Sequence, residues 1–302
     1  MSEALIKVEG LSIHYLLPEG AIAAVRNVTF DIYPDEVFGL VGESGSGKST
    51  LCHGLLRLVP SPGKIVSGQV HFKGEDLLSL QGEELRKKRW REIAFIPQGA
   101  MSALNPVIRI GEQFADVVAD HSEGNQGGKV DWEVRVADAL QSVNLPIDVA
   151  HKFPHELSGG MKQRVCIALA VMLNPALILA DEPTSALDVV TQRVVLEMLS
   201  QVRRQLKASM LLVGHDMALQ AQIADRIGIM FGGCLLEIGS VQDIFNQPIH
   251  PYTKRLIASI PSIRKKQDIH VLAQDGFNEV EQQTYLDFSR LTEVRPGHWV
   301  AQ

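Results

Sequence analysis

The chain contains few cysteines and no excess of positive charge. Only 3 of its 302 residues are cysteine, at Cys52, Cys166 and Cys234, and they are too scattered to form a disulfide framework or a CxxC metal site. This pattern fits a reducing cytoplasm, and we expect all three to be small residues of the core. The formal net charge of −6 gives no support to a nucleic-acid partner, which usually requires a basic surface.

Long hydrophobic runs are also absent. The most apolar stretch, residues 165–180, is interrupted by Asn174-Pro175 and is shorter than the ~20 residues that a membrane-spanning helix needs. The start, Met1-Ser2-Glu3-Ala4-Leu5, lacks the basic region and apolar core of a secretory signal. We therefore expect a soluble protein without a signal peptide. Its length allows more than one lobe, taking ~150 residues per domain as a prior, and no internal repeat is visible.

One glycine-rich segment has the full pattern of a phosphate-binding loop. Residues 42–49 read Gly-Glu-Ser-Gly-Ser-Gly-Lys-Ser, with two glycines separated by four residues and followed by Lys and Ser. Residues 37–41 before it form a short apolar run that is typical of a buried strand. From Ser49 onward the apolar residues Leu51, Leu55 and Leu58 have helical spacing. A strand, a glycine loop and a helix in this order predict a site for a nucleoside triphosphate.

Each residue type in this loop has a chemical reason. Gly42, Gly45 and Gly47 allow positive φ and let backbone N–H groups approach phosphate oxygens closely. We expect Lys48 to bridge the β- and γ-phosphates and Ser49 to offer its hydroxyl to Mg²⁺. The positive end of the following helix dipole adds to the attraction. The alternative interpretation is a glycine-rich turn followed by a solvated lysine.

The segment ahead of the loop alternates like β-strands. Apolar positions between residues 5 and 38 predict a small antiparallel layer, with a hairpin turn at Pro18-Glu19-Gly20. Tyr15 lies in this layer and either stacks on a nucleotide base or packs on the sheet. After the loop, residues 66–72 predict another strand.

A charged helix is expected next, at residues 82–92. Its basic run, Arg86-Lys87-Lys88-Arg89, is interpreted as the solvated face of that helix rather than as a nucleic-acid patch.

Two further strands are expected to end in polar residues. Strand 93–96 runs into Pro97-Gln98, and the carboxyl end of a strand is where an α/β sheet places ligand contacts. Strand 177–180 is followed by Asp181 and Glu182. We expect Asp181 to reach Mg²⁺ and Glu182 to orient or deprotonate an attacking water. The alternative is an acidic loop cap.

Between these two strands, residues 100–175 have helical patterning and few strand signals, which predicts a helical insert in the core sheet. Within it, Leu157-Ser158-Gly159-Gly160-Met161 begins a helix with Ser158 as the expected N-cap. A Ser-Gly-Gly helix start is either a second anion site or a simple turn.

The segment after residue 182 returns to α/β alternation. Ser185-Ala186-Leu187-Asp188 precedes a predicted helix at 189–206, and a strand at 210–214 leads to His215. A histidine in this position either contacts a γ-phosphate or is a surface residue at a strand end.

The last part of the chain predicts a hairpin between residues 227–230 and 234–238. From Ser240 onward we interpret the chain as an appendage. It has a helix near 241–246, then the segment His250-Pro251-Tyr252-Thr253-Lys254, and then a polar tail.

The order of these motifs resembles the nucleotide-binding subunit of ATP-binding-cassette (ABC) transporters over roughly residues 5–260. In that family the matching segments are called Walker A (42–49), Q-loop (Gln98), signature (157–161), Walker B (177–182), D-loop (185–188) and switch (His215). The resemblance implies an α/β fold: a P-loop NTPase (RecA-like) core with a mostly parallel sheet, an N-terminal antiparallel β subdomain and an inserted α-helical subdomain at about 100–175. It places the ATPase domain at 1–240 and a C-terminal extension at 241–302.

The resemblance also implies roles for individual residues. It implies catalytic roles for Glu182, His215 and Lys48. It also implies that Ser49, Gln98 and Asp181 bind Mg²⁺. The nucleotide is expected to contact Tyr15, Gly42, Ser44, Gly45, Ser46, Gly47, Lys48, Ser49, Thr50 and Gln98, together with Ser158, Gly159 and Gly160.

Further motifs are similar to the ATPases of oligopeptide, dipeptide and nickel importers. They are Ser102-Ala103-Leu104-Asn105-Pro106, Phe153-Pro154-His155-Glu156 and His250-Pro251-Tyr252. Many members of that subfamily carry a cysteine cluster for an iron–sulfur centre in the tail, but no cysteine follows Cys234 here, so we expect no cluster. Asp35-Glu36 stands where Gly-Glu is usual, a change in a turn that we expect to be tolerated.

The function implied is ATP hydrolysis that drives uptake of peptides or a related solute. In this family each ATP is held between Walker A of one subunit and the signature of the other, in a head-to-tail ATPase dimer. The implied partners are a second ATPase subunit (a related chain or a second copy), two transmembrane permease subunits and, indirectly, an extracytoplasmic solute-binding protein. The implied location is peripheral, on the cytoplasmic face of the inner membrane.

Other functions are less well matched by the sequence. A nickel, metallophore or oligosaccharide importer remains the alternative for the cargo. A soluble ABC ATPase of translation or DNA repair usually has two cassettes in one chain or long coiled-coil inserts, and neither is visible. In a P-loop kinase or GTPase, residues 157–161 would have no role.

Overall fold

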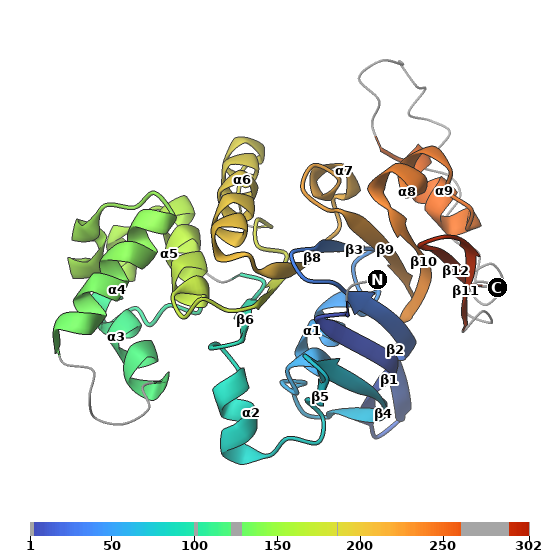
Figure 1. The fold of residues 1–302 in the computed structure, drawn as a ribbon, viewed down its shortest axis with the longest axis horizontal. Helices are drawn as coiled ribbons and strands as arrows, with labels where there is room; N and C mark the ends of the chain where they lie inside the picture. Colours follow the sequence, from blue (N-terminus) through green and yellow to red (C-terminus); the bar gives the residue numbers. More distant parts are fainter. Residues whose placement is uncertain (1–2, 100–101, 122–128, 186, 261–289, 302) are drawn as a thin grey trace. The chain divides into compact units, whose positions relative to one another are not determined.

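The computed structural model describes residues 3–99, 102–121, 129–185, 187–260 and 290–301 (Figure 1). The chain divides into two compact units. The helical unit comprises Glu3, Tyr33–Glu36 and the described residues of Ser79–Leu212. The β-rich unit comprises Ala4–Ile32, Val37–Leu78 and the described part of residues 213–302.

The β-rich unit contains a four-stranded antiparallel sheet in the order β2-β1-β4-β5. Its strands are β1 (Ile6–Leu17), β2 (Gly20–Ile32), β4 (Gly63–Phe72) and β5 (Glu75–Asp76). Ile6 pairs with both Ile32 and Phe72. Ile6 and Val8 are fully buried and Lys7 between them is exposed, because successive side chains of a strand point to opposite faces. The antiparallel layer and the hairpin turn predicted before the loop are confirmed.

The same unit contains a second set of neighbouring strands, in the order β11-β12-β10-β9-β3. They are β3 (Val37–Val41), β9 (Arg226–Phe231), β10 (Cys234–Ser240), β11 (Leu291–Arg295) and β12 (His298–Ala301). β3 and β9 pair in parallel, with Val41 opposite Ile229, whereas the other pairs are antiparallel. The hairpin predicted between β9 and β10 is confirmed.

Among its described residues, the β-rich unit has four helices: α1 (Lys48–Leu55), α7 (Met217–Gln220), α8 (Val241–Asn246) and α9 (Pro251–Ala258). The helix predicted after the phosphate loop ends at Leu55, so Leu58 lies outside it although its spacing is helical.

The described part of the C-terminal appendage contains elements that the sequence did not predict. Helix α9 includes most of residues 250–254. The segment after Lys254, interpreted as a polar tail, contains the β11–β12 hairpin, and Val300 of β12 pairs with Glu237 of β10. The hairpin is too short to give a strand pattern of its own, and β10 supplies the pairing edge that the sequence alone does not show.

The helical unit contains the parallel strands β6 (Ile93–Ile96) and β7 (Leu177–Asp181), with Ile96 opposite Ala180. β7 lies between β6 and β8 (Ser209–Gly214), whose last two residues belong to the β-rich unit. All five residues of β7 are buried, which explains its uninterrupted apolar run.

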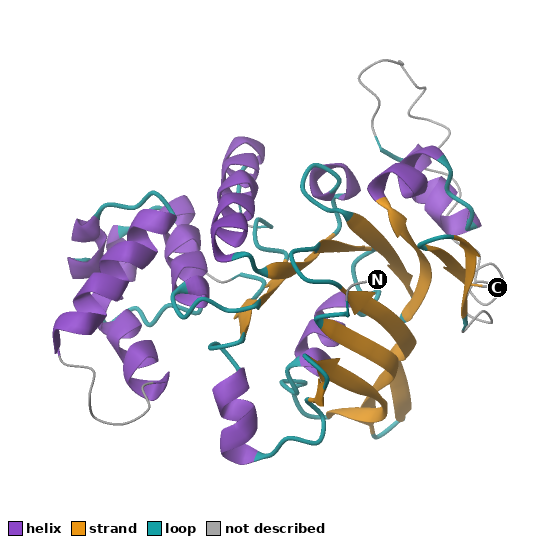
Figure 2. Cartoon of the chain, viewed as in Figure 1, coloured by secondary structure: helices purple, strands orange, loops and turns teal. Residues whose placement is uncertain are grey.

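Helices make up most of the remaining helical unit (Figure 2). They are α2 (Gly82–Lys88), α3 (Ile110–His121), α4 (Lys129–Ser142), α5 (Gly159–Val171) and α6 (Val189–Leu206), with 3₁₀ turns at Ile147–His151 and Pro154–Glu156. The helical character predicted between β6 and β7 and the bounds predicted for α6 are confirmed. The domain boundaries near residues 100, 175 and 240 stay predictions.

Helix α2 is shorter than the predicted range 82–92. Arg89 has an extended backbone and Trp90 has a φ of 67°. The indole N–H of Trp90 donates to the Leu169 carbonyl at 2.7 Å. This tertiary contact ends the helix although the charged pattern continues, because local propensity is a weak constraint beside a specific tertiary hydrogen bond. Arg86 and Lys87 are exposed, as predicted for a solvated face.

The unusual Asp35-Glu36 turn is accommodated by an ion pair. Asp35 has a φ of 61°, a conformation that favours glycine but that Asp adopts more readily than most residues. Arg203 of α6 donates from Nη1 to the Asp35 carboxylate and to the Asp35 carbonyl, both at 2.7 Å. The turn therefore gains a hydrogen-bond anchor that a glycine would not provide.

Two predictions from composition can also be compared with the structure. Cys52, Cys166 and Cys234 are all buried and unbridged, as expected for core residues. Among the helices that the structure describes, none is both long and apolar enough to cross a membrane.

Candidate functional site

The phosphate loop starts from a firmly held strand. All five residues of β3 are buried, and its first residue exchanges two hydrogen bonds with Asp225. The Val37 N–H donates to the Asp225 carboxylate at 2.8 Å, and the Asp225 N–H donates to the Val37 carbonyl at 2.8 Å. The loop therefore begins at a fixed position, at the carboxyl end of β3. The carboxyl ends of strands are where α/β folds bind their ligands.

Lys48 is the first residue of α1, and its side chain folds back across the loop. Only 5% of it is exposed. Its Nζ donates to the carbonyls of Gly42 at 2.8 Å and Glu43 at 2.7 Å, and to the Ser46 hydroxyl at 3.1 Å. The loop tip, Glu43 to Gly45, is exposed. A buried ammonium below an exposed turn of backbone N–H groups is the arrangement expected of an anion cradle.

The three loop glycines are required for different reasons. A Cβ on Gly42 would lie 2.1 Å from the Met230 carbonyl, and a Cβ on Gly47 would lie 2.1 Å from the Ala24 carbonyl. Gly45 has a φ of 79°, and a Cβ there would meet no atom within 4 Å. Two glycines are therefore fixed by close packing, and the third presents bare backbone to open space.

This difference predicts how much stability is lost when each glycine is replaced by alanine. We expect Gly47→Ala to lower the free energy of unfolding by about 3 kcal/mol or more, because it combines a backbone clash with a left-handed φ of 101°. Gly45→Ala is the matched control, and we expect it to cost about 1 kcal/mol from backbone strain alone. Urea unfolding of both variants measures the difference; equal costs would show that the packing around Gly47 is not as described.

Tyr15 lies beside the start of α1. It is half-buried in β1, its hydroxyl is 3.5 Å from the Thr50 hydroxyl, and its ring packs against Gly63. The structure thus brings Tyr15 to the helix that follows the phosphate loop. Stacking of its ring on a nucleotide base stays a prediction.

In the helical unit, Gln98 and Glu182 lie together. β6 and β7 are parallel neighbours, so the residues that follow them emerge at the same edge. Gln98 Nε2 donates to the Glu182 carboxylate at 3.0 Å. Asp181, the last residue of β7, is 1% exposed. The prediction that these residues lie at strand ends is confirmed, and the pairing of the two strands is a finding of the structure. Their catalytic and metal-binding roles stay predictions.

Glu182 has a strained backbone. Its φ of 45° lies in the left-handed region, which costs a residue other than glycine about 1–3 kcal/mol. The N–H and the hydroxyl of Ser185 both donate to its carbonyl at 3.2 Å, which holds the conformation. Backbone strain that is retained at Glu182, whose carboxylate accepts a hydrogen bond from Gln98, supports a functional role for this side chain.

The signature segment begins α5 as predicted. The Ser158 hydroxyl accepts from the Met161 N–H at 3.3 Å, which confirms the N-cap, and Ser158 and Gly159 are exposed. The preceding turn is anchored by the Glu156 carboxylate, which accepts from the Phe153 N–H at 2.6 Å. The helix start is exposed, and anion binding there stays a prediction.

Asp188 of the D-loop is the N-cap of α6. Its carboxylate accepts from the Thr191 N–H at 3.0 Å and from the Thr191 hydroxyl at 2.6 Å. These hydrogen bonds lower the pKa of Asp188. Ala186 of the same segment lies outside the described residues.

His215 is exposed directly after β8, and Asp216 beside it is the N-cap of α7. Sequence reasoning missed Gln220, which is 3% exposed in α7. A Cβ on Gly39 or on Gly214 would lie within 3 Å of the Gln220 amide (2.7 and 2.8 Å). An isolated glycine inside a strand signals such a close approach, so Gly39 was the available clue.

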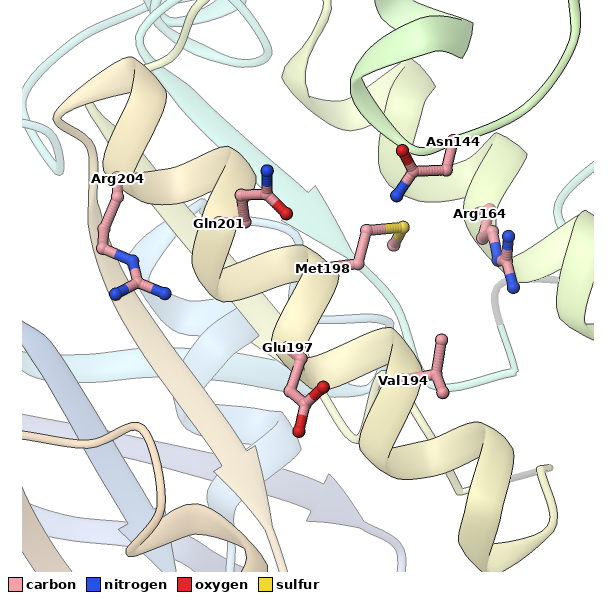
Figure 3. A pocket seen from close by; sticks show the side chains of 7 residues that line it. All are labelled: Asn144, Arg164, Val194, Glu197, Met198, Gln201 and Arg204. Atoms are coloured by element: carbon pink, nitrogen blue, oxygen red, sulfur yellow. The ribbon is translucent and has the colours of Figure 1, made fainter.

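A pocket of about 460 Å³ in the helical unit contains none of the predicted site residues (Figure 3). Its lining is mostly the exposed side of α6, with one residue after α4 and one from α5: Asn144, Arg164, Val194, Glu197, Met198, Gln201 and Arg204. It has no glycine-rich backbone turn, so it does not compete with the phosphate loop as a nucleotide site.

Comparison with known proteins relates the chain to two sequence families. Residues 25–185 match the family described as "ABC transporter", and residues 236–284 match "Oligopeptide/dipeptide transporter, C-terminal region". The dipeptide transport ATP-binding protein DppD of Caldanaerobacter subterraneus subsp. tengcongensis is 44% identical over 260 residues, which are 86% of this chain and 79% of that protein. The oligopeptide transport ATP-binding protein OppD of Bacillus subtilis is 37% identical over 275 residues, which are 90% of this chain and 76% of that protein.

Solved structures show the same likeness. A dimeric ATP-binding cassette in a post-hydrolysis state, bound to ADP and Pi, is 29% identical with a TM-score of 0.68 and covers 78% of this chain and 98% of its own. The similarity thus extends over both units of the chain.

Proposed function

The chain belongs to the ABC transporter family, and we propose that it is the ATP-hydrolysing subunit of an importer for dipeptides or oligopeptides. The proposal of peptides as the transported solute rests on one observation. The match to the ABC transporter family at 25–185 is followed by a match to the oligopeptide/dipeptide transporter C-terminal region at 236–284. Relatives at 44% and 37% identity are named for dipeptide and oligopeptide transport.

In this proposal the phosphate loop binds the triphosphate of ATP. Backbone N–H groups of the exposed loop tip meet phosphate oxygens, and Lys48 exchanges part of its contacts with the loop carbonyls for the β- and γ-phosphates. Ser44, Ser46 and Thr50 lie in or directly after the loop and complete the contacts. Tyr15, beside Thr50, is proposed to contact the base.

We propose Asp181, Ser49 and Gln98 as ligands of Mg²⁺, on the chemistry of their side chains. A carboxylate, a hydroxyl and an amide each offer the oxygen ligand that Mg²⁺ prefers. When bound, the ion neutralises charge on the phosphates. Glu182 is proposed to orient and deprotonate the attacking water, positioned by Gln98, and His215 to contact the γ-phosphate.

The site is proposed to be completed by a second cassette. In the family, the far side of the triphosphate is covered by Ser158, Gly159 and Gly160 of the partner, and the N-cap geometry of Ser158 leaves this helix start exposed. The solved relatives include dimers. We propose a related ATPase as the partner, with a second copy of this chain as the alternative. Two permease subunits in the inner membrane and an extracytoplasmic binding protein complete the transporter.

Growth rescue tests the cargo. A strain that lacks this subunit and requires an amino acid is given that amino acid as a dipeptide or longer peptide, and parallel cultures are made dependent on nickel or on an oligosaccharide. We expect the wild-type chain to restore growth on the peptides, and a Lys48→Ala variant not to. Rescue confined to nickel or to the oligosaccharide would contradict the proposal.

A further inference from the structure

A buried glutamine contacts the strand that leads to the phosphate loop. Gln220, the last residue of α7, is 3% exposed, and a side-chain amide that leaves water costs free energy unless it finds polar partners. Its Nε2 donates to the carbonyl of Leu40 in β3 at 3.5 Å. Its Oε1 lies so close to Gly39 of the same strand that a Cβ there would be only 2.7 Å away. The amide is therefore packed on the backbone of β3.

The same amide also contacts the residue that precedes His215. A Cβ on Gly214, the last residue of β8, would lie 2.8 Å from Gln220 Nε2. Apart from the neighbours of Gly214 in the chain and the Gln220 amide, no described atom would come within 4 Å of this Cβ. A glycine inside a strand weakens the strand and often marks the close approach of another group. Gly39 and Gly214 thus leave room for one and the same side chain.

The residues between Gly214 and Gln220 form a hydrogen-bonded turn that carries His215. The Asp216 carboxylate accepts from the Leu219 N–H at 2.9 Å, and the Asp216 carbonyl accepts from the Gln220 N–H at 3.1 Å. His215 itself is exposed. Its backbone position is therefore set by these hydrogen bonds and by the Gln220 side chain, which closes the turn onto Gly214.

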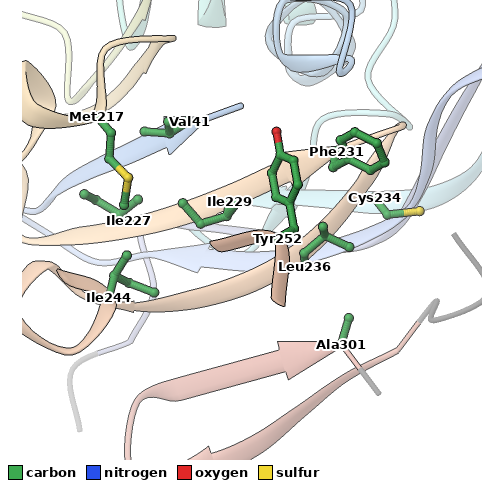
Figure 4. Packing of buried hydrophobic residues seen from close by; sticks show 10 residues of the cluster. All are labelled: Val41, Met217, Ile227, Ile229, Phe231, Cys234, Leu236, Ile244, Tyr252 and Ala301. Atoms are coloured by element: carbon green, nitrogen blue, oxygen red, sulfur yellow. The ribbon is translucent and has the colours of Figure 1, made fainter. Parts of the chain in front are cut away.

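The chain on both sides of Gln220 is anchored to β3 as well. Met217 of α7 is 3% exposed and belongs to a buried apolar cluster that also contains Val41, the last residue of β3 (Figure 4). After α7, Asp225 bonds to Val37, the first residue of β3, through its N–H and through its carboxylate, at 2.8 Å each. The segment after His215 thus contacts the first residue, the middle and the last residue of β3, and Gln220 provides the contact in the middle.

We propose that Gln220 is a positioning residue for His215. Its amide keeps the turn that carries His215 at a fixed place relative to β3, so that the imidazole can meet the γ-phosphate of a nucleotide held by the phosphate loop. The inference rests on the proposed contact between His215 and the γ-phosphate, and it adds a residue that lies outside the sequence motifs.

A double-mutant cycle with His215 tests this role. Single-turnover hydrolysis and ATP affinity of the full-length protein, with a candidate partner ATPase present, are measured for wild type, Gln220→Met, His215→Ala and the double variant. Methionine keeps the length and the unbranched shape of glutamine but removes the amide. We expect Gln220→Met to lower the single-turnover rate about tenfold, since a misplacement of about 1 Å can cost about 10²-fold. ATP affinity is expected to stay within about twofold of wild type, because the phosphate loop is unaltered.

The second background distinguishes positioning from a general loss of structure. In His215→Ala, the further change Gln220→Met is expected to leave the rate as it is, because the group that Gln220 positions is already absent. An unchanged rate in Gln220→Met alone, or an equal loss in both backgrounds, would overturn the proposal.

Gln222→Met is the matched control. It is the same substitution two residues later in the chain, on a side chain that is exposed. We expect the wild-type rate of hydrolysis. A loss equal to that of Gln220→Met would show that any change in this segment slows hydrolysis, and it would overturn the proposal.

Gly214→Ala tests the contact from the opposite side. The φ of Gly214 lies outside the left-handed region, and the added Cβ would displace only the Gln220 amide. We therefore expect Gly214→Ala to slow hydrolysis in the wild-type background. In a Gln220→Ala background the Cβ has room, so the same change is expected to have no effect. An effect of equal size in both backgrounds would contradict the contact.

Hydrogen exchange without nucleotide provides a readout that does not depend on activity. We expect the amides of residues 216–221 to exchange faster in Gln220→Met than in Gln222→Met, and equal exchange would show that the amide does not hold the turn. If wild type hydrolyses no ATP, the proposed function fails and the positioning role fails with it. If wild type is active and the cycle shows no coupling, only the role of Gln220 fails.

Discussion

Replacing Lys48 by alanine is expected to abolish ATP turnover and to lower ATP affinity by about a hundredfold or more, because two charge-assisted hydrogen bonds to phosphate are worth roughly 1.5–3 kcal/mol each. The ammonium is already held at the mouth of the loop by the carbonyls of Gly42 and Glu43. No other lysine in or next to the loop can replace it. Calorimetry with ATP and a phosphate-release assay measure the two losses.

Lys73→Ala removes the same charge from the same unit and serves as the control. Lys73 lies near the Phe72 ring, between β4 and β5, away from the loop in sequence. We expect it to bind and hydrolyse ATP normally. Unchanged ATP binding in Lys48→Ala would eliminate the assignment of residues 42–49 as the phosphate loop.

Glu182→Gln is expected to lower the rate of hydrolysis by about 10³-fold, the usual contribution of a general base, while ATP still binds. The substitution keeps the size of the side chain and can keep a hydrogen bond to Gln98, but it removes the ability to accept a proton. The strained φ of 45° is a backbone property and is expected to persist. Single-turnover hydrolysis and equilibrium ATP binding separate the two effects.

The same substitution at Glu197 is the control for this variant. Glu197 lies on α6 of the same unit and pairs with Arg193 at 2.9 Å on the surface. We expect Glu197→Gln to hydrolyse ATP at the wild-type rate. Hydrolysis by Glu182→Gln within tenfold of wild type would show that another group accepts the proton.

Much of the core could be predicted from the sequence because its strands are buried on both faces. β3 and β7 are short apolar runs that are entirely buried, and each is followed by polar residues where the site begins. The bounds of α6 were also predictable, since Asp188 is a strong N-cap signal before a helical pattern. The positions of Gln98 and Glu182 at strand ends could also be predicted, whereas their hydrogen bond depends on the pairing of β6 with β7 that the structure shows.

Features that depend on distant parts of the chain could not be predicted in this way. Helix α2 ends where Trp90 bonds to Leu169, 79 residues later. The ring of Tyr252 packs 4.7 Å from that of Phe231, which joins α9 to the end of β9, and no local pattern in either segment indicates the other. Similarly, Arg203 holds the Asp35 turn from 168 residues away. Such contacts are set by tertiary packing, which periodicity does not encode.

We propose that this chain provides half of an ATP site and that a second cassette completes it. Analytical ultracentrifugation of the Glu182→Gln variant, alone and with a candidate partner ATPase, measures its mass in solution with and without ATP and Mg²⁺. We expect a dimer that forms only when ATP is present, because binding without hydrolysis keeps the two cassettes closed. A chain that stays monomeric with ATP, even when the partner ATPase is added, would contradict the shared site.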